Sequence, residues 1–163
     1  MKNIIKFRLA IGFVISIFLL MTQCDKFTDV DFLTKNNFIL DATSQEFDVK
    51  TKQQTYINAL TVNGITGYEF RLLEKMGTND TVIYYDNYSV RFIKDNKGQD
   101  YGEPVEIIGE WFRIEKSEPS STTTHVSIDE NNEYSERSLI IGIDGSDPLV
   151  MSNNITIKQK KKD

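Results

Sequence analysis

Aromatic side chains with polar neighbours are the residues of this sequence that suggest binding chemistry. Trp111 opens the segment Trp111-Phe112-Arg113-Ile114, and Tyr85 and Tyr88 flank the pair Asp86-Asn87. A flat ring can stack on the apolar C–H face of a pyranose, while neighbouring carboxylate and amide groups hydrogen-bond its hydroxyls. Trp111, Tyr85 and Tyr88 are therefore the candidate ligand-binding residues, and the ligand class they suggest is a glycan.

Each candidate ring also has a structural interpretation. Side chains alternate along a strand, so Trp111 faces away from the core if Phe112 and Ile114 face into it. A bulge at Gly109, or a covering loop, would instead hide the indole and make it a packing residue. The two tyrosines would equally form a cross-strand pair, which stabilises a sheet by less than about 1 kcal/mol.

No pattern in the sequence predicts catalysis, and we expect a protein without catalytic residues or cofactors. There is no G-x-S-x-G turn and no glycine-rich phosphate loop. Carboxylates at Glu103, Glu106 and Glu110 lie near Trp111, but a glycosidase pair is defined by its separation in space, and a domain this small offers little room for a cleft. The chain is thus expected not to be an enzyme.

Metal and nucleic-acid binding are not expected either. The run Asp129 to Glu133 offers oxygen ligands, but Tyr134 stands where an EF-hand needs glycine. A calcium site of another type in the acidic loops stays open. With a single histidine, His125, and a single cysteine, zinc has no ligand set. The formal net charge is −5, whereas a nucleic-acid partner would require a basic face.

The cysteine, Cys24, stands where an apolar run ends. Lys2, Lys6 and Arg8 precede an apolar stretch over residues 9–21, in the order of an n-region and an h-region. The stretch makes a helix of about 20 Å, too short for a hydrocarbon core of roughly 30 Å. Leu20-Met21-Thr22-Gln23-Cys24 resembles the lipobox of bacterial lipoproteins. The resemblance implies cleavage after residue 23 and lipidation of Cys24.

Lipidation would explain how the single thiol is used. Two or three acyl chains, at about 0.8 kcal/mol per buried methylene, hold a protein on a bilayer where one chain is marginal. An unmodified lone cysteine in an exported protein would be a reactive thiol. The alternative is an uncleaved membrane anchor with an incidental cysteine. Removal of residues 1–23 leaves 140 residues with 16 Lys and Arg against 24 Asp and Glu, a net charge of −8.

The elements that must position the candidate rings are short strands. After residues 24–37, which show no period and are expected to form a flexible tether, apolar alternations are separated by turn residues. The predicted strands are 38–41, 46–50, 56–63, 68–74, 81–85, 88–94, 105–115, 124–128, 138–144 and 154–158. Tyr85 to Tyr88 is predicted to be a tight hairpin turn. Many short strands without helical periodicity predict an all-β, antiparallel sandwich.

The second half of the chain has an order of features that resembles the BACON domain, an immunoglobulin-like module common in bacteria that degrade complex glycans. The features are Trp111-Phe112-Arg113-Ile114, the turn Ser117 to Ser121, the strand from His125 to Asn131, Arg137 opening a strand, and Ile155-Thr156-Ile157-Lys158-Gln159. In the first half, an extra hairpin over residues 81–94 exceeds what the family needs. The resemblance implies an immunoglobulin-like sandwich and a glycan-related setting, although such a module can also act as a spacer.

The predicted organisation is a lipoprotein signal peptide over 1–23, a tether over 24–37, a BACON-like immunoglobulin-like β-sandwich over 38–159 and a solvated basic tail over 160–163. The expected role is a non-catalytic binding module, with glycan as ligand, anchored to a bilayer through Cys24. The expected location is the outer membrane of a Gram-negative cell envelope. The alternative is a structural or adhesion scaffold that binds another envelope protein through strand edges and has no sugar site.

Overall fold

The described part of the chain is built from β-strands. The computed structural model describes residues 28–66, 72–76, 80–85, 87–93, 103–147 and 150–162, and every regular element in these ranges is a strand. The all-β prediction is confirmed. Since the described residues contain no helix, none of them forms a helix able to cross a bilayer.

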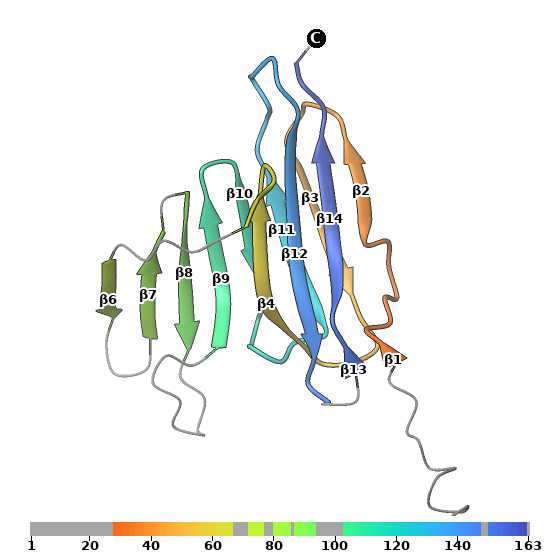
Figure 1. Ribbon diagram of the computed structural model, residues 1–163, viewed down its shortest axis with the longest axis vertical. Helices are drawn as coiled ribbons and strands as arrows, with labels where there is room; N and C mark the ends of the chain where they lie inside the picture. Colours follow the sequence, from red (N-terminus) through yellow and green to blue (C-terminus); the bar gives the residue numbers. More distant parts are fainter. Residues whose placement is uncertain are drawn as a thin grey trace, which may run out of the picture.

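The strands form two main sheets and one short pair (Figure 1). The five-stranded sheet runs in the order β2 (Asn37–Leu40), β14 (Asn153–Gln159), β12 (Arg137–Gly145), β4 (Thr55–Val62), β5 (Ile65–Thr66). The seven-stranded sheet runs in the order β3 (Gln45–Lys50), β11 (Thr123–Ile128), β10 (Phe112–Glu115), β9 (Glu103–Gly109), β8 (Tyr88–Ile93), β7 (Asp80–Tyr84), β6 (Leu72–Met76). The short pair joins β1 (Thr28–Asp29) to β13 (Val150–Met151).

The order of the central strands is that of an immunoglobulin-like sandwich. Strands β3, β11 and β10 take the places of B, E and D in one sheet, and β4, β12 and β14 take those of C, F and G in the other. The predicted sandwich is therefore confirmed. Its pairings are antiparallel except where β2 joins β14 and β1 joins β13, which are parallel.

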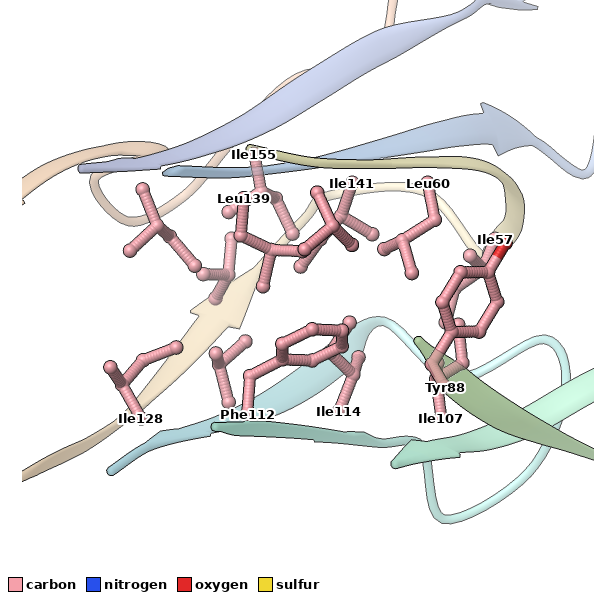
Figure 2. Close-up of a cluster of buried hydrophobic side chains, with 14 of the residues drawn as sticks. Ile57, Leu60, Tyr88, Ile107, Phe112, Ile114, Ile128, Leu139, Ile141 and Ile155 are labelled. Atoms are coloured by element: carbon pink, nitrogen blue, oxygen red, sulfur yellow. The ribbon is translucent and has the colours of Figure 1, made fainter. Parts of the chain in front are cut away.

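Alternation along each strand builds the core between the sheets. In β12, Leu139, Ile141 and Ile143 are completely buried, and in β14 Ile155 and Ile157 are as well. Figure 2 shows this layer facing side chains from β9, β10 and β11 across the sandwich, with Tyr88 at its end and its ring directed toward Ile57. Burying such side chains contributes about 1.5 to 3 kcal/mol each relative to exposure, so the core is the main source of stability.

The seven-stranded sheet has more strands than the five-stranded sheet that packs against it. Strands β6 to β9 continue it beyond β10, and in Figure 1 they extend to one side of the strands of the five-stranded sheet. The predicted extra hairpin over residues 81–94 is confirmed as β7 and β8, which pair antiparallel with Tyr84 opposite Ser89. These four strands are called the extension below.

One predicted strand, over residues 105–115, is wrong, because the chain reverses in its middle. β9 and β10 form a tight antiparallel hairpin in which Arg113 lies opposite Ile108. Glycine at 109 leaves room for the ring of Phe112, which a Cβ at that position would overlap. Continuous apolar alternation hid the turn, which contains neither proline nor an Asn-Gly pair.

The predicted tether is also shorter than expected. Thr28 and Asp29 pair with β13, Val30 is buried in the core, and the Leu33 N–H donates to the Lys50 carbonyl at 2.8 Å. Residues 28–37 therefore belong to the sandwich, because Val30 lies in its core and Phe32 packs against that core. Residues 1–27, with the predicted signal peptide, Cys24 and the start of the tether, lie outside the described residues.

The predicted basic tail lies along the body as far as the structure describes it. The Lys160 N–H donates to the Leu40 carbonyl at 3.0 Å, and the Lys162 N–H donates to the Glu133 carbonyl at 3.0 Å. The lysine side chains stay exposed, although Lys160 Nζ donates to Asp41 Oδ1 at 2.9 Å and Lys162 Nζ donates to Asn132 Oδ1 at 3.0 Å.

Candidate functional site

A pocket of about 170 Å³ opens where the extension passes the edge of the five-stranded sheet. One wall is β4 and the other is the inner face of β8 and β9. Two of the three predicted binding residues, Tyr85 and Tyr88, line it. The lining residues are Ile57, Asn58, Ala59, Leu60, Tyr85, Tyr88, Val90, Phe92, Pro104 and Ile107.

The tyrosines form the end of this pocket. The Tyr85 N–H donates to the Tyr88 carbonyl at 2.8 Å, which closes the predicted tight turn between β7 and β8. Their ring centroids lie 4.9 Å apart with the planes tilted by 32°. Tyr88 is buried and Tyr85 half-buried, so Tyr88 supplies the floor and Tyr85 the accessible ring. Asn87 is exposed beside them, whereas Asp86 lies outside the described residues.

The β4 wall is a strand edge. β4 pairs with β12 on one side, but with β5 only at Thr61 and Val62 on the other. Among the described residues, 56–59 have no strand pairing on this second side, so backbone groups lie at the pocket edge. The described lining residues carry no charged side chain. The pocket therefore combines an apolar aromatic floor with neutral polar groups.

A bulge in β4 shapes this edge. The register between β4 and β12 shifts between Gly142 and Ile143, which leaves Asn58 as the extra residue. Asn58 donates from its amide to Asp144 Oδ1 at 2.7 Å, and a Cβ on Gly142 would overlap its amide oxygen. Sequence reasoning missed Asn58. The available signal was Gly142, a glycine inside an alternating strand, which often marks a bulge.

Trp111 is not part of this site. It lies in the turn between β9 and β10, is 6% exposed, and meets Phe112 edge to face at 5.1 Å. The Arg137 guanidinium carbon sits 4.7 Å from the centre of its ring. A sugar cannot stack on a face that a guanidinium already covers. The structure therefore supports the interpretation of Trp111 as a packing residue. Its ring is covered by the Arg137 side chain as well as by the turn that holds it.

The residues that carried the family resemblance meet at this end of the sandwich. Arg137 donates to Gln159 Oε1 at 2.9 Å and to the Asp129 carbonyl at 3.2 Å. Gln159 donates to the Asp129 carbonyl at 2.9 Å, and Asn131 donates to the Lys160 carbonyl at 2.9 Å. Burial lowers the pKa of Arg137, and Glu133 opposes that effect most. We call Trp111, Arg137, Gln159, Asn131 and Asp129 the end cluster; its bonds are structural.

A buried lysine joins the two sheets at the other end of β10. Lys116 is 5% exposed, and its Nζ donates to the Thr55 carbonyl at 2.6 Å and to Thr55 Oγ1 at 2.9 Å. Burial lowers the pKa of Lys116 to about 8, while the charge of Glu103 acts in the opposite direction. No periodic signal distinguishes this lysine from an exposed one, so the sequence did not reveal it.

The acidic loop over residues 129–133 is organised by hydrogen bonds. Asn131 is fully buried, its N–H donates to the Ala42 carbonyl at 2.6 Å, and its Oδ1 accepts from the Glu133 N–H at 3.1 Å. In the described ranges, no three His, Cys, Asp or Glu side chains gather closely enough to hold a metal. His125 contacts Asp48 Oδ1 at 2.8 Å on the outer face of the seven-stranded sheet.

Comparisons with known proteins add little to this geometry. No protein-family model matches the chain, and no curated protein does. Among solved structures, the chain is similar to one titled "NMR structure of the protein from Bacteroides thetaiotaomicron" at 13% sequence identity. That match covers 84% of this chain and 86% of the other, with a TM-score of 0.47. At that score the similarity carries no argument about function.

Proposed function

We propose that this protein is a non-catalytic glycan-binding module held on the outer membrane of a Gram-negative cell envelope by lipid on Cys24. The ligand site is the pocket of about 170 Å³ lined by Tyr85 and Tyr88, which is called the tyrosine pocket below. The observation that carries this proposal is the pair of rings at its end, with Tyr85 accessible and Tyr88 beneath it. The order of features resembling the BACON domain supports the same class of ligand.

The size and chemistry of the pocket support one sugar ring as its occupant. Its volume of about 170 Å³ is smaller than the roughly 300 to 1,000 Å³ of pockets that enclose drug-sized ligands. An apolar floor suits the C–H face of a pyranose, and the neutral polar groups of the β4 edge suit its hydroxyls. The absence of charged side chains among the described lining residues favours a neutral sugar over an acidic one.

Glycan binding is tested with the full chain in a detergent that has no sugar headgroup. Retention on an array of neutral and acidic glycans is compared for the unchanged chain, Tyr85→Ala and Tyr134→Ala. Tyr134 is 85% exposed and does not line the pocket, so it is the matched control. We expect Tyr85→Ala alone to weaken retention about tenfold, at an unchanged melting temperature. Equal retention by all three proteins would remove the tyrosine pocket as the site.

The lipid anchor is tested separately. Mass spectrometry of the membrane fraction should find a diacylated or triacylated peptide that begins at Cys24. Cys24→Ser should release the protein from that fraction or leave the uncleaved precursor. An intact segment over residues 1–23 on the mature protein would contradict the proposal.

The scaffold alternative is favoured by one observation at the other edge of the five-stranded sheet. Among the described residues β2 pairs only with β14, and its Ile39 side chain is 70% exposed. An open edge with an exposed apolar side chain suits strand addition by another protein. A photo-crosslinker at position 39 would then give a discrete adduct in intact envelopes, while one at position 134 would not. No adduct at position 39 would leave the glycan role as the sole proposal.

A further inference from the structure

A second hollow lies on the opposite face of the extension. It measures about 270 Å³ and is lined by Val82, Tyr84, Ser89, Arg91, Glu106 and Ile108, from β7, β8 and β9. The tyrosine pocket lies on the inner face of the same strands. Tyr84 and Tyr85 follow each other in the chain, and each lines a different hollow.

Strand register explains the shape of this hollow. Tyr84 of β7 lies opposite Ser89 of β8, and Ser89 lies opposite Ile108 of β9, so the three side chains share one row on one face. A small side chain stands between two large ones, which leaves a notch over Ser89. Tyr84 is 39% exposed and Ile108 44% exposed, so both walls of the notch are accessible.

The adjoining row supplies fixed polar groups. Arg91 Nε donates to Glu106 Oε2 at 2.8 Å, and Arg113 Nη2 donates to Glu106 Oε1 at 2.5 Å. Glu106 is thereby held in one orientation between two guanidinium groups. Each carboxylate oxygen keeps a second lone pair, so Glu106 can still accept a hydrogen bond from a ligand hydroxyl. Ser89 adds a hydroxyl at the floor.

The backbone under this hollow leaves no opening for strand addition. β7 pairs with β6 and β8, and β8 pairs with β7 and β9, so the main-chain groups of both strands are used by the sheet. Recognition must therefore come from side chains: an aromatic wall, a hydroxyl and a positioned carboxylate. These groups suit a ring with one apolar face and several hydroxyls better than they suit an extended peptide.

We propose that the notch over Ser89 is a second glycan-binding site, in which Tyr84 stacks on a sugar ring and Glu106 and Ser89 bind its hydroxyls. This inference rests on the proposed glycan-binding function, and it adds a site on the opposite sheet face. Two sites on opposite faces would let one module contact two chains of a polysaccharide, or two segments of one chain, with a gain in avidity.

The test uses the full chain and a glycan retained in the array experiment. Affinity is measured by migration in gels containing the polysaccharide, for Tyr84→Ala, Tyr85→Ala and the control Tyr134→Ala, each with its melting temperature. Ser89→Leu fills the notch while keeping Tyr84, and Ser89→Ala leaves the notch open. We expect Tyr84→Ala and Ser89→Leu each to weaken binding at least about fivefold, and Ser89→Ala to have a smaller effect.

The outcomes separate the two proposals. Loss of affinity in Tyr84→Ala and Ser89→Leu, with folding intact, supports the second site, whether or not Tyr85→Ala also binds weakly. Full affinity in both variants, together with weakened binding by Tyr85→Ala, overturns the second site and keeps the proposed function. If the unchanged chain is not retarded by any glycan, the proposed function fails and the second site fails with it.

Discussion

Two aromatic groups in the same seven-stranded sheet have opposite surroundings. The Trp111 ring lies in the end cluster, covered by Arg137 on its face and by Phe112 at its edge. Tyr85 lies in the extension beside the β4 edge of the five-stranded sheet, and Tyr84 lies on the outer face of the extension, which that sheet does not cover. The comparison shows that an aromatic residue becomes core or surface according to the sheet face it occupies and to whether side chains of the other sheet lie over it.

The largest effect is expected at the end cluster. Trp111→Ala should lower the free energy of unfolding by about 3 to 5 kcal/mol, because it removes a buried ring and leaves Arg137 without its aromatic partner. Denaturant unfolding of the full chain measures this. Tyr134→Ala is the control, with a change inside about 0.5 kcal/mol. A loss below about 1 kcal/mol for Trp111→Ala would mean that the two aromatic groups do not differ as described.

The pKa of Lys116 tests whether water reaches the space between the two sheets of the sandwich. Folding lowers its pKa from 10.5 to about 8, so between these pH values the unfolded chain binds a proton that the folded chain does not. The free energy of unfolding should therefore rise with pH from about 8 to about 10.5, by up to about 3 kcal/mol from this group. Below pH 8 both states hold the proton, and the group gives no slope.

Lys116→Met should remove this rise, measured as the difference between variant and unchanged chain in unfolding free energy against pH. Lys158→Met, at an exposed position of β14, is the matched control and should leave the slope as it is. An identical slope in the Lys116 variant would show that water reaches its amine.

Gln159 tests how much the hydrogen bonds of the end cluster contribute to stability, and its expected effect is smaller. Its amide donates to the carbonyls of Ala42, Thr43 and Asp129, and its oxygen accepts from Arg137. Gln159→Met keeps the volume but removes these four hydrogen bonds, so we expect a loss of about 1 to 3 kcal/mol. Thermal unfolding is the measurement, and a variant as stable as the unchanged chain would argue against a structural role for the end cluster.

The smallest effect on stability is expected in the extension. Tyr85→Ala should change the free energy of unfolding by less than about 1 kcal/mol, since its ring is half-buried and its partner Tyr88 keeps its place in β8. Chemical denaturation, run beside Trp111→Ala, gives the contrast directly. A loss equal to that of Trp111→Ala would mark Tyr85 as core and remove it from the proposed site.

Most of the sandwich follows from local pattern. The alternation in residues 138–144 and 154–158 predicts β12 and β14, because one buried face demands a period of two. The turn between β7 and β8 follows from two turn-forming residues between apolar runs. The strand β5 was missed, although Asn63 and Gly64, both with positive φ, form the Asn-Gly pair that favours such a turn.

The candidate sites depend on quantities that a local pattern does not contain. Both hollows depend on which strands pair and in which register, such as Tyr84 beside Ser89 and Ser89 beside Ile108. The covering of Trp111 by Arg137 joins residues 26 positions apart in the chain. Periodicity predicts that such side chains lie on strands. It does not predict how many strands each sheet has, or which strands the other sheet leaves uncovered.

Residues 28–33 lie against the sandwich, and this limits how far the domain can be from Cys24. Four residue steps, each at most about 3.6 Å, separate Cys24 from Thr28. If the acyl chains are on the Cys24 sulfur, the Cα atom of Thr28 at the β1 end of the domain stands within about 15 Å of the Cα atom that carries the lipidated side chain. Such a protein cannot sample the space above the envelope on a stalk. Its ligands must come to within the length of the domain from the membrane surface, or be delivered there by neighbours in the same leaflet.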